Sequence, residues 1–391
     1  MLIGVVGKPS AGKSTFFKAA TQVNVATADY PFTTIKPNHA VGYVRVKCVD
    51  QEFNVKCNPR EGMCKEGTRF VPVELLDVAG LVPGAHEGKG MGNQFLDDLR
   101  QGDCLIHVVD ASGSTNEKGE RVKTGSHDPL KDVRFLEIEL DMWYYNILNR
   151  AWPGIAKTTT IDDAPKALSK QFSGLGVTLD MAKKCPTPKK PLRAWTEEEL
   201  KTISTYFRKQ TKPIIIVANK ADTQHAKENI ERLKKEYKEY LIIPSSAESE
   251  VALREADKKG LIQYTPGANK FTITGELNEK QKTALEFIQK NVLDVYGSTG
   301  VQEALDQATF TFLQYIAIFP GGTKGFGDRF GNILPDCFLL PPNSTTLDFA
   351  YKLHKELGDK FIKAIDVRTK RVLGKEHELK HRDIIEIVSQ R

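Results

Sequence analysis

The feature that most constrains this chain of 391 residues is the segment with which it begins. An apolar run at 2–6 leads directly into the pattern G-x-x-x-x-G-K-S, and a stretch that can form a helix follows it. A strand, a glycine-rich loop and a helix in this order are typical of a phosphate-binding loop, because backbone N–H groups and the helix N-terminus attract anionic oxygens. We therefore expect a nucleotide to bind at Gly7, Lys8, Pro9, Ser10, Ala11, Gly12, Lys13, Ser14 and Thr15.

Residue types within this loop predict separate roles. Gly7 and Gly12 lack a Cβ, so the backbone can fold around phosphate oxygens. Lys13 is placed to reach the β- and γ-phosphates and so to act in catalysis, and the hydroxyl of Ser14 is placed to bind Mg²⁺.

A second apolar strand, at 70–76, ends in the pattern D-x-x-G, formed by Asp77 and Gly80. In sites of this kind the Asp reaches Mg²⁺ through a water and the Gly N–H contacts the γ-phosphate, so Gly80 is a second predicted catalytic group. Thr33 and Thr34 lie between the two motifs. A threonine hydroxyl there could close over Mg²⁺ and lose that contact when the γ-phosphate leaves.

Two further motifs predict which base is read. The apolar run at 213–218 ends in Asn219, Lys220 and Asp222 of an N-K-x-D pattern, in which the Asp carboxylate accepts from N1–H and the 2-amino group of guanine. Ser246 and Ala247 follow the strand at 241–244 and match a loop whose backbone N–H meets guanine O6. Each pattern follows a buried strand, and ligands of open α/β sheets bind at the carboxyl ends of strands.

With these motifs in place, the sequence resembles the Obg-like translation-factor GTPases, in the archaeal and eukaryotic branch of their YchF-related group. The resemblance rests on YPFTTIKPN at 30–38 and on DVAGLVPGAH at 77–86, continued by GKGMGNQFL at 88–96. It implies a C-terminal TGS module, binding to the ribosome, and hydrolysis of a purine nucleoside triphosphate. It also implies that Ser14 and Thr34 are Mg²⁺ ligands, beside Asp77.

Three positions bear on how far the resemblance extends. The intact N-K-x-D motif favours GTP, although many close relatives have a degraded motif and prefer ATP. Leu81 stands where Ras-like enzymes carry the Gln that orients the attacking water. His86 could assist catalysis or be a surface histidine. Ser10 stands where potassium-activated relatives carry Asn, so the sequence leaves a K⁺ requirement open.

The predicted fold is α/β: a P-loop GTPase domain with a helical insertion and a C-terminal TGS-like β-grasp domain. We assign 1–127 and 209–305 to the G domain, 128–208 to the insertion and 306–391 to the β-grasp domain. The insertion is predicted from apolar residues three and four apart, among them Leu136, Leu140 and Trp143. The stretch 251–305 is expected to be helical, with Val295 on its apolar face. Strands are expected at 311–318, 337–340, 362–367 and 384–388, and one helix between the second and third of them, ending at Gly358.

Charge and cysteine content constrain partners and chemistry less strongly. A net charge of +6 permits contact with nucleic acid, and a basic, proline-rich stretch at 183–193 is either an RNA contact or a solvated linker. Cys48, Cys57 and Cys64 are spaced by nine and seven, which does not fit C-x₂₋₄-C pairing. We therefore expect reduced thiols in a surface loop and keep metal binding as the alternative. Cys104 is expected in the core.

These observations favour a GTPase that binds GTP and GDP with Mg²⁺. It would act in translation as a molecular switch bound to the ribosome, rRNA or tRNA. A nucleotide-dependent RNA-binding scaffold with negligible hydrolysis is the alternative, as is a member that prefers ATP; a small-molecule kinase is disfavoured because it has no use for a guanine motif. No secretory signal or membrane span is evident, so we expect a cytoplasmic protein without membrane partners. The glycine-rich stretch 84–92 is expected to be ordered by the γ-phosphate. The sequence does not determine the oligomeric state.

Overall fold

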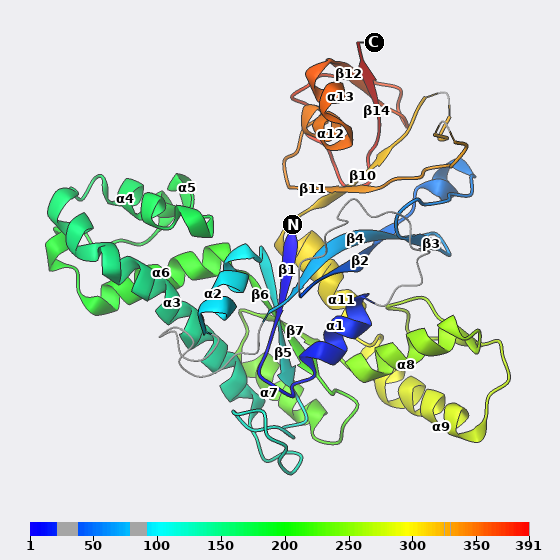
Figure 1. The fold of residues 1–391 in the computed structure, drawn as a ribbon, viewed down its shortest axis with the longest axis horizontal. Coiled ribbons are helices and arrows are strands. Elements are labelled where there is room, and N and C mark those ends of the chain that lie inside the picture. The colour runs from blue at the N-terminus through cyan, green and yellow to red at the C-terminus, as the bar shows by residue number, and fades with distance from the viewer. Residues whose placement is uncertain (22–37, 79–91, 324, 329, 391) are drawn as a thin grey trace. The chain divides into compact units, whose positions relative to one another are not determined.

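The computed structural model describes residues 1–21, 38–78, 92–323, 325–328 and 330–390 (Figure 1). The chain divides into two compact units. The first comprises Met1–Ala19, Leu75–Ala252 and Leu277–Val301, and the second comprises Ala20–Glu74, Leu253–Glu276 and Gln302–Arg391.

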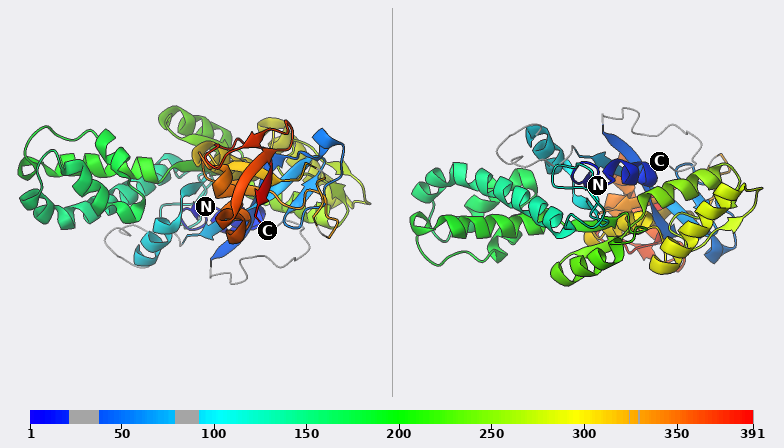
Figure 2. Two further views of the ribbon diagram at one scale, coloured as in Figure 1. Left: turned by 90° about the horizontal axis from the view of Figure 1, so that it is seen from above. Right: turned by 90° about the horizontal axis from the view of Figure 1, so that it is seen from below.

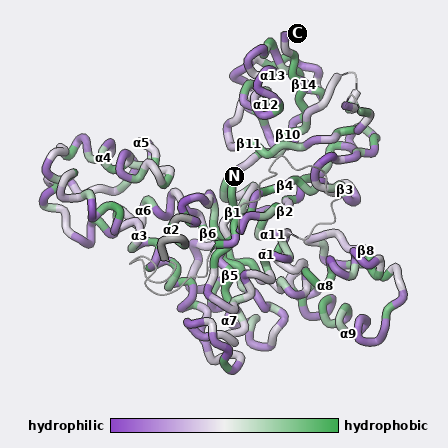
Figure 3. Tube along the Cα trace, viewed as in Figure 1, coloured by the Kyte–Doolittle hydropathy of each residue, from purple (hydrophilic) through white to green (hydrophobic). Residues whose placement is uncertain are grey.

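A parallel sheet forms the centre of the first unit. Its strands, in spatial order, are β1 (Leu2–Val6), β5 (Cys104–Asp110), β6 (Ile214–Asn219) and β7 (Leu241–Pro244). β5 and β6 are buried along their whole length, because helices cover both faces of a parallel sheet. Figure 3 shows hydrophobic residues along β1 and β5. Cys104 is buried there, as predicted.

Helices α1 (Lys13–Thr21), α2 (Gly92–Gln101), α7 (Ala226–Glu236) and α8 (Ala247–Lys258) connect or follow these strands. β4 (Thr68–Asp77) begins in the second unit and ends in the first, beside β1. The carboxyl ends of the parallel strands therefore meet at one edge, where the predicted motifs lie.

The stretch after β5 is helical, as expected. It contains α3 (Pro129–Thr158), α4 (Ala164–Gln171), α5 (Leu179–Lys184) and α6 (Glu197–Thr211). α3 and α6 lie side by side and extend away from the sheet (Figures 1 and 2). Leu136, Leu140 and Trp143 are buried in the core between these helices. Thr196 and Glu199 form a capping box that begins α6.

The prediction that 251–305 is helical throughout is wrong in part. A short hairpin of β8 (Ile262–Gln263) and β9 (Thr272–Ile273) interrupts it. α9 (Glu279–Ile288) then passes through a π-helical turn at Gln289–Leu293 into α10 (Asp294–Tyr296), which ends at Gly297. The wider π turn rotates the residues after it around the helix axis. Val295 is consequently exposed instead of lying on the predicted apolar face.

The C-terminal part of the second unit has the predicted β-grasp arrangement. Its sheet has the order β11-β10-β14-β12-β13. The strands are β10 (Ile316–Pro320), β11 (Phe338–Leu340), β12 (Phe361–Asp366), β13 (Val372–Leu373) and β14 (Ile384–Ser389). Helix α12 (Thr346–Leu353) packs on it, with its Phe349 in the core of the sheet. β2 (His39–Lys47) and β3 (Met63–Lys65) also belong to this unit.

Two boundaries in this part differ from the prediction. The strand expected from residue 311 begins at Ile316, because α11 (Val301–Asp306) continues through a π-helical turn at Gln307–Phe312. The helix expected to end at Gly358 stops at Leu353, and α13 (Lys355–Asp359) follows. His354 separates the two, because its extended backbone and its Nδ1, which accepts from the Glu356 N–H, form an N-cap.

Across the described residues, no helix is both long enough and apolar enough to cross a membrane.

Candidate nucleotide-binding site

The predicted phosphate-binding loop lies between β1 and α1 and lines a hollow of about 600 Å³. Seven of the residues predicted to bind nucleotide line it from this loop: Lys8, Pro9, Ser10, Gly12, Lys13, Ser14 and Thr15. Lys220 of the N-K-x-D motif and residues of the loop after β5, Ser114, Thr115, Arg121 and Val122, complete the lining. The structure thus brings the phosphate-binding loop and the N-K-x-D motif to one cavity.

Packing within the protein itself requires both glycines of the loop. A Cβ on Gly7 would lie 2.6 Å from the backbone oxygen of Val108 in β5. Gly12 has a φ of +93°, and its Cβ would lie 2.2 Å from Nδ2 of Asn219. The sequence predicted these glycines from the space that phosphate needs, whereas the structure adds a contact with a neighbouring strand or loop in each case.

Lys13 and Asp77 form an ion pair near the carboxyl ends of β1 and β4. Both side chains are partly exposed, so each can reach a ligand in the hollow. The hydroxyl of Ser14 is exposed nearby on the first turn of α1. A hydroxyl and a carboxylate are the oxygen ligands that Mg²⁺ prefers, so Ser14 and Asp77 fit the predicted metal set. Such an ion, with a triphosphate, would give Lys13 and Asp77 separate partners.

Lys8 uses its side chain inside the protein. Its ammonium group is buried, donates to the backbone oxygen of Thr115 at 2.7 Å and lies 2.8 Å from a carboxylate oxygen of Asp132. His127 Nε2 lies 2.8 Å from the other oxygen of Asp132. Burial raises the pKa of Asp132 despite the opposing effect of Lys8 and His127. Only the backbone of Lys8 is therefore free to serve a phosphate.

The loop after β5 forms a part of the site that the sequence motifs did not predict. Asp110 is fully buried at the end of β5, and its carboxylate accepts from Ser112, Ser114, Thr115 and the ammonium group of Lys220. Burial by itself would raise the pKa of Asp110, but Lys220 and the hydroxyl donors outweigh it and lower that pKa. An Asp at the end of a largely apolar strand, followed by three hydroxyl residues, was the available signal.

Asn219 joins the base-reading loop to the two other loops of the site. Its Nδ2 donates to the backbone oxygen of Ala11 at 3.1 Å, as the motif predicts. Its Oδ1 accepts from the backbone N–H of Ala247 at 3.1 Å. This N–H is the one that the motif assigns to guanine O6. The O6 atom would therefore either share this donor with Asn219 Oδ1 or replace Asn219 Oδ1 as its acceptor.

The loop that carries Ser246 and Ala247 is held from behind by a segment that sequence reasoning missed. The Ser246 N–H donates to the backbone oxygen of Thr299 at 3.0 Å. Gly300, with a φ of +78°, approaches so closely that a Cβ there would lie 2.0 Å from the backbone oxygen of Pro244. The turn at 298–300 therefore sets the position of the predicted O6-reading loop.

Asp222 lies half-buried at the edge of a second hollow of about 660 Å³. α8 and α9 provide most of the other lining, including Glu248, Ala252 and Phe287. Apolar and carboxylate groups side by side suit a purine base, which needs a surface to stack on and an acceptor for its donors.

The remaining predicted site residues, Thr33, Thr34, Gly80 and His86, lie outside the residues that the structure describes, as does Leu81. Their predicted roles in metal binding and catalysis remain predictions.

The whole chain is similar to known proteins. Three family profiles match it: a 50S ribosome-binding GTPase at residues 2–136, an Obg-like GTPase YGR210-like G4 motif-containing domain at 217–321, and a TGS domain at 330–389. The GTP-binding protein MJ1332 of Methanocaldococcus jannaschii is 48% identical over 392 residues, which is 99% of each chain. The chain belongs to the YchF/Obg-like family of P-loop GTPases.

Other relatives in this family are similar over most of the chain. The ribosome-binding ATPase YchF of Bacillus subtilis is 32% identical over 267 residues, 66% of this chain and 68% of that protein. A crystal structure of a GTP-binding protein from Pyrococcus horikoshii OT3 matches all of both chains, with a TM-score of 0.75 and 37% identity. The YchF GTPase of Schizosaccharomyces pombe has the same fold, with a TM-score of 0.61 and 20% identity. Family members are nucleotide hydrolases, and this chain is a P-loop GTPase with a C-terminal TGS domain.

Proposed function

We propose that the protein hydrolyses GTP to GDP and phosphate with Mg²⁺, and that it acts in the cytoplasm as a nucleotide-dependent switch on the ribosome. The observation that carries the guanine part of this proposal is the pair of hydrogen bonds made by Asn219. They tie the N-K-x-D loop to the phosphate-binding loop and to the loop of Ala247. A triphosphate in the first hollow and a base beside Asp222 would use the phosphate-binding loop, the N-K-x-D loop and the loop of Ala247.

Hydrolysis would depend on groups that stabilise charge on the phosphates. Lys13 supplies a cation, Ser14 and Asp77 fit an Mg²⁺ ion, and the N-terminus of α1 adds the partial positive charge of its free N–H groups. Leu81 has no group that could orient a water, so hydrolysis by the isolated protein is expected to be slow. A partner that places the attacking water would then control the rate.

The names of the relatives support the ribosomal part of the proposal. The Bacillus subtilis relative is called a ribosome-binding ATPase, and the profile that matches residues 2–136 is that of a 50S ribosome-binding GTPase. The basic stretch at 183–193, which begins in the last turn of α5 and continues towards α6, gives the helical part a surface suited to RNA phosphates.

A preference for ATP is the second candidate, and one observation favours it. Relatives such as the human Obg-like ATPase 1, which is 27% identical over 274 residues, are named as ATPases.

Displacement of a fluorescent GDP analogue by unlabelled GTP or ATP, each with Mg²⁺, tests the base. Sites built around hydrogen bonds discriminate strongly, so we expect GTP to compete at least about 100-fold better than ATP. Equal competition, or better competition by ATP, would reject the guanine assignment. Phosphate release measured with and without purified ribosomes tests the switch: stimulation supports it, and negligible release under both conditions favours the RNA-binding scaffold.

A further inference from the structure

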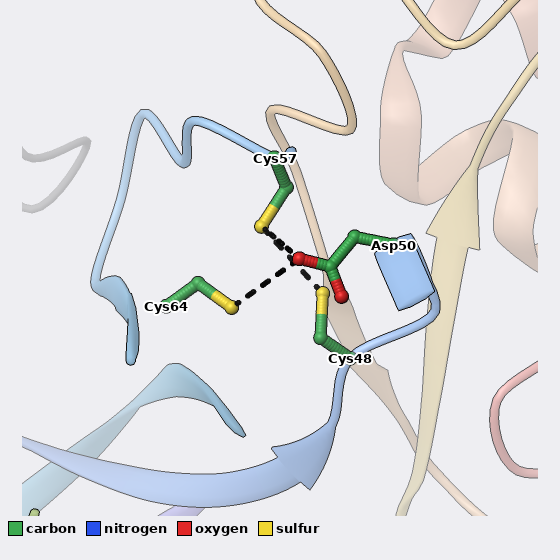
Figure 4. Close-up of side chains that lie close together, drawn as sticks. All are labelled: Cys48, Asp50, Cys57 and Cys64. Carbon is green, nitrogen blue, oxygen red and sulfur yellow. Dashed lines mark hydrogen bonds between the residues drawn. The ribbon is translucent and has the colours of Figure 1, made fainter. Parts of the chain in front are cut away.

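Three cysteines and an aspartate from the segment 48–64 lie together in the second unit. Cys48 follows β2, Asp50 begins a short 3₁₀ helix at Asp50–Phe53, Cys57 lies in the loop beyond it, and Cys64 lies in β3. One potential ligand atom from each of the four falls within 4.8 Å of the other three (Figure 4). The sequence predicted reduced thiols in a surface loop: the thiols are free, but the surface position is wrong, because Cys48 and Cys57 are buried together with Asp50.

The spacing of these atoms matches a metal centre better than a disulfide. The Sγ atoms of Cys48 and Cys57 are 3.6 Å apart. Two thiolates on one tetrahedral Zn²⁺, with Zn–S bonds of about 2.3 Å, lie about 3.8 Å apart, whereas a disulfide brings them to about 2.05 Å. In a [4Fe–4S] cluster each cysteine binds a different iron, so its cysteine sulfurs lie further apart than these.

Asp50 is held as a metal-binding carboxylate usually is. Its Oδ1 accepts from the backbone N–H of Gln51 at 2.8 Å. Its Oδ2 faces the sulfurs and accepts from Cys57 at 3.2 Å. One oxygen is thus fixed by the backbone, and the other is directed at the centre of the cluster, which is the arrangement that orients a ligand for a metal.

We propose that Cys48, Asp50, Cys57 and Cys64 form a structural zinc site. Four protein ligands, three of them thiolates, form a closed tetrahedral set, and soft thiolates select Zn²⁺ over Mg²⁺ or Ca²⁺. The buried guanidinium of Arg69, which lies in the same unit, adds positive charge that offsets part of the net negative charge of Zn²⁺ with four anionic ligands.

The segment that carries the ligands also holds the C-terminal module. The Asn58 N–H donates to the backbone oxygen of Ile333 at 3.0 Å, and the Arg60 N–H donates to that of Pro335 at 3.0 Å. Phe53 packs against Phe326 with the rings tilted by 55° and their centroids 4.5 Å apart. Glu52 accepts from Arg368 and Arg382, both in the TGS-like module. The zinc ion would therefore clamp the loop at 48–64 on which this module docks.

The first experiment measures metal in the full-length protein after expression in zinc-supplemented medium. We expect about one zinc per chain in the wild type and at least a tenfold loss in Cys57→Ser and in Cys64→Ser. Cys185→Ser is the matched control, because Cys185 is another buried thiol, outside the cluster, and this variant should keep its zinc. Wild type without zinc, or cluster variants that retain it, would overturn the proposal.

A second measurement does not depend on the folding of a variant. Co²⁺ added to metal-stripped wild type should give the intense visible bands of a tetrahedral thiolate site, and one equivalent of Zn²⁺ should abolish them. Stripping should also speed hydrogen exchange at the Asn58 and Arg60 amides at least tenfold. A Co²⁺ spectrum without thiolate bands, or a Cys48–Cys57 disulfide found by mass spectrometry in protein kept reduced, would contradict the site.

Discussion

At the scale of single residues, the site is built from side chains with more than one partner. Asn219 bonds to Ala11 and Ala247, Asp110 to three hydroxyls and Lys220, and Lys13 to Asp77. Substitutions that remove one polar group and keep the shape therefore separate recognition, catalysis and folding.

Asp222→Asn tests how the base is read. The carboxylate would accept from two donors of guanine, and the loss of charge-assisted hydrogen bonds of about 1.5–3 kcal/mol predicts roughly a 10- to 100-fold weaker affinity for GTP. The Asn amide can donate to the 2-oxo group of xanthine, so affinity for xanthosine triphosphate should rise. Glu228→Gln, which changes an exposed carboxylate on α7 outside this hollow, is the control and should leave both affinities unchanged. An unchanged ratio of the two affinities in Asp222→Asn would exclude this role.

Lys13→Ala tests the phosphate-binding loop. Removing a cation directed at the phosphates should lower the rate of phosphate release at least about 100-fold. Unfolding free energy should change by less than about 1 kcal/mol, because Lys13 and Asp77 form a partly exposed pair. Lys18→Ala, an exposed lysine later in α1, should keep the wild-type rate. Normal turnover by Lys13→Ala would show that the loop does not act on the phosphates.

His107→Leu tests a buried histidine beneath the site. Burial in β5, together with the charge of Lys8, lowers the pKa of His107 from 6.5 to about 3. Between these values the unfolded chain binds a proton that the folded protein does not, so the free energy of unfolding falls as the pH falls. At pH 5 this cost is about 2 kcal/mol relative to pH 7, and urea titration of His107→Leu should lack it. The exposed control His377→Leu should retain the wild-type slope, and an equal slope in both variants would contradict the assignment.

At the scale of elements, the ends of parallel strands place the motifs, and a separate turn fixes one of them. The turn at 298–300 follows the π-helical segment and α10, and it bonds to the loop after β7 through Thr299 and Ser246. The position of the predicted O6-reading loop therefore depends on a helix that comes some fifty residues later, as the bond between Glu250 and Thr299, 49 residues apart, also shows.

Gly300→Ala tests this dependence. Its Cβ would lie 2.0 Å from the Pro244 oxygen, so the loop of Ser246 and Ala247 must move. Gly297→Ala is a matched control, because Gly297 has a similar φ of +79° but no atom within 4 Å of its Cβ position. Gly297→Ala should lose about 1–2 kcal/mol of stability through backbone strain, and Gly300→Ala should lose more because the clash is added to the same strain. Only Gly300→Ala should also weaken GDP binding, by at least about tenfold, because small displacements of positioning groups are costly. Equal GDP affinity in the two variants would show that the turn does not set the site.

At the scale of the whole molecule, the described residues of the nucleotide site lie in the first unit, and the proposed zinc site lies in the second. Ligand binding opposes those openings that disrupt its site, so a unit that opens independently is not stabilised by a ligand of the other unit. The effects of the two ligands should therefore be separable in the intact chain.

Hydrogen exchange of the full-length protein tests this separation. Saturating Mg²⁺–GDP, at about 100 times its Kd, should stabilise the nucleotide-binding unit by about 2.7 kcal/mol and slow exchange at 7–15, 110–115 and 219–222. Zinc removal should speed exchange at 48–64 and 330–337. It should leave exchange at 7–15, 110–115 and 219–222 unchanged. Loss of protection across the nucleotide site on zinc removal would show that the units do not unfold separately.

The sequence by itself determined the fold class and the order of the motifs, because these depend on local properties. A strand followed by a glycine-rich turn and a helix is a short-range unit, and the alternation of apolar residues marks Leu136, Leu140 and Trp143 without knowledge of their partners. The β-grasp module was predictable for the same reason, although its first strand and its helix end were misplaced by a π turn and by the cap at His354.

Only the tertiary structure decided which distant side chains meet. It turned Lys8 inward to Asp132, made Asp110 the partner of Lys220, and gave the Ala247 N–H to Asn219. It also gathered Cys48, Asp50, Cys57 and Cys64, whose spacing had argued against a metal, because the β3–β4 hairpin folds Cys64 back onto the end of β2. Such contacts join residues through the path of the backbone in space, and spacing along the chain carries no record of that path.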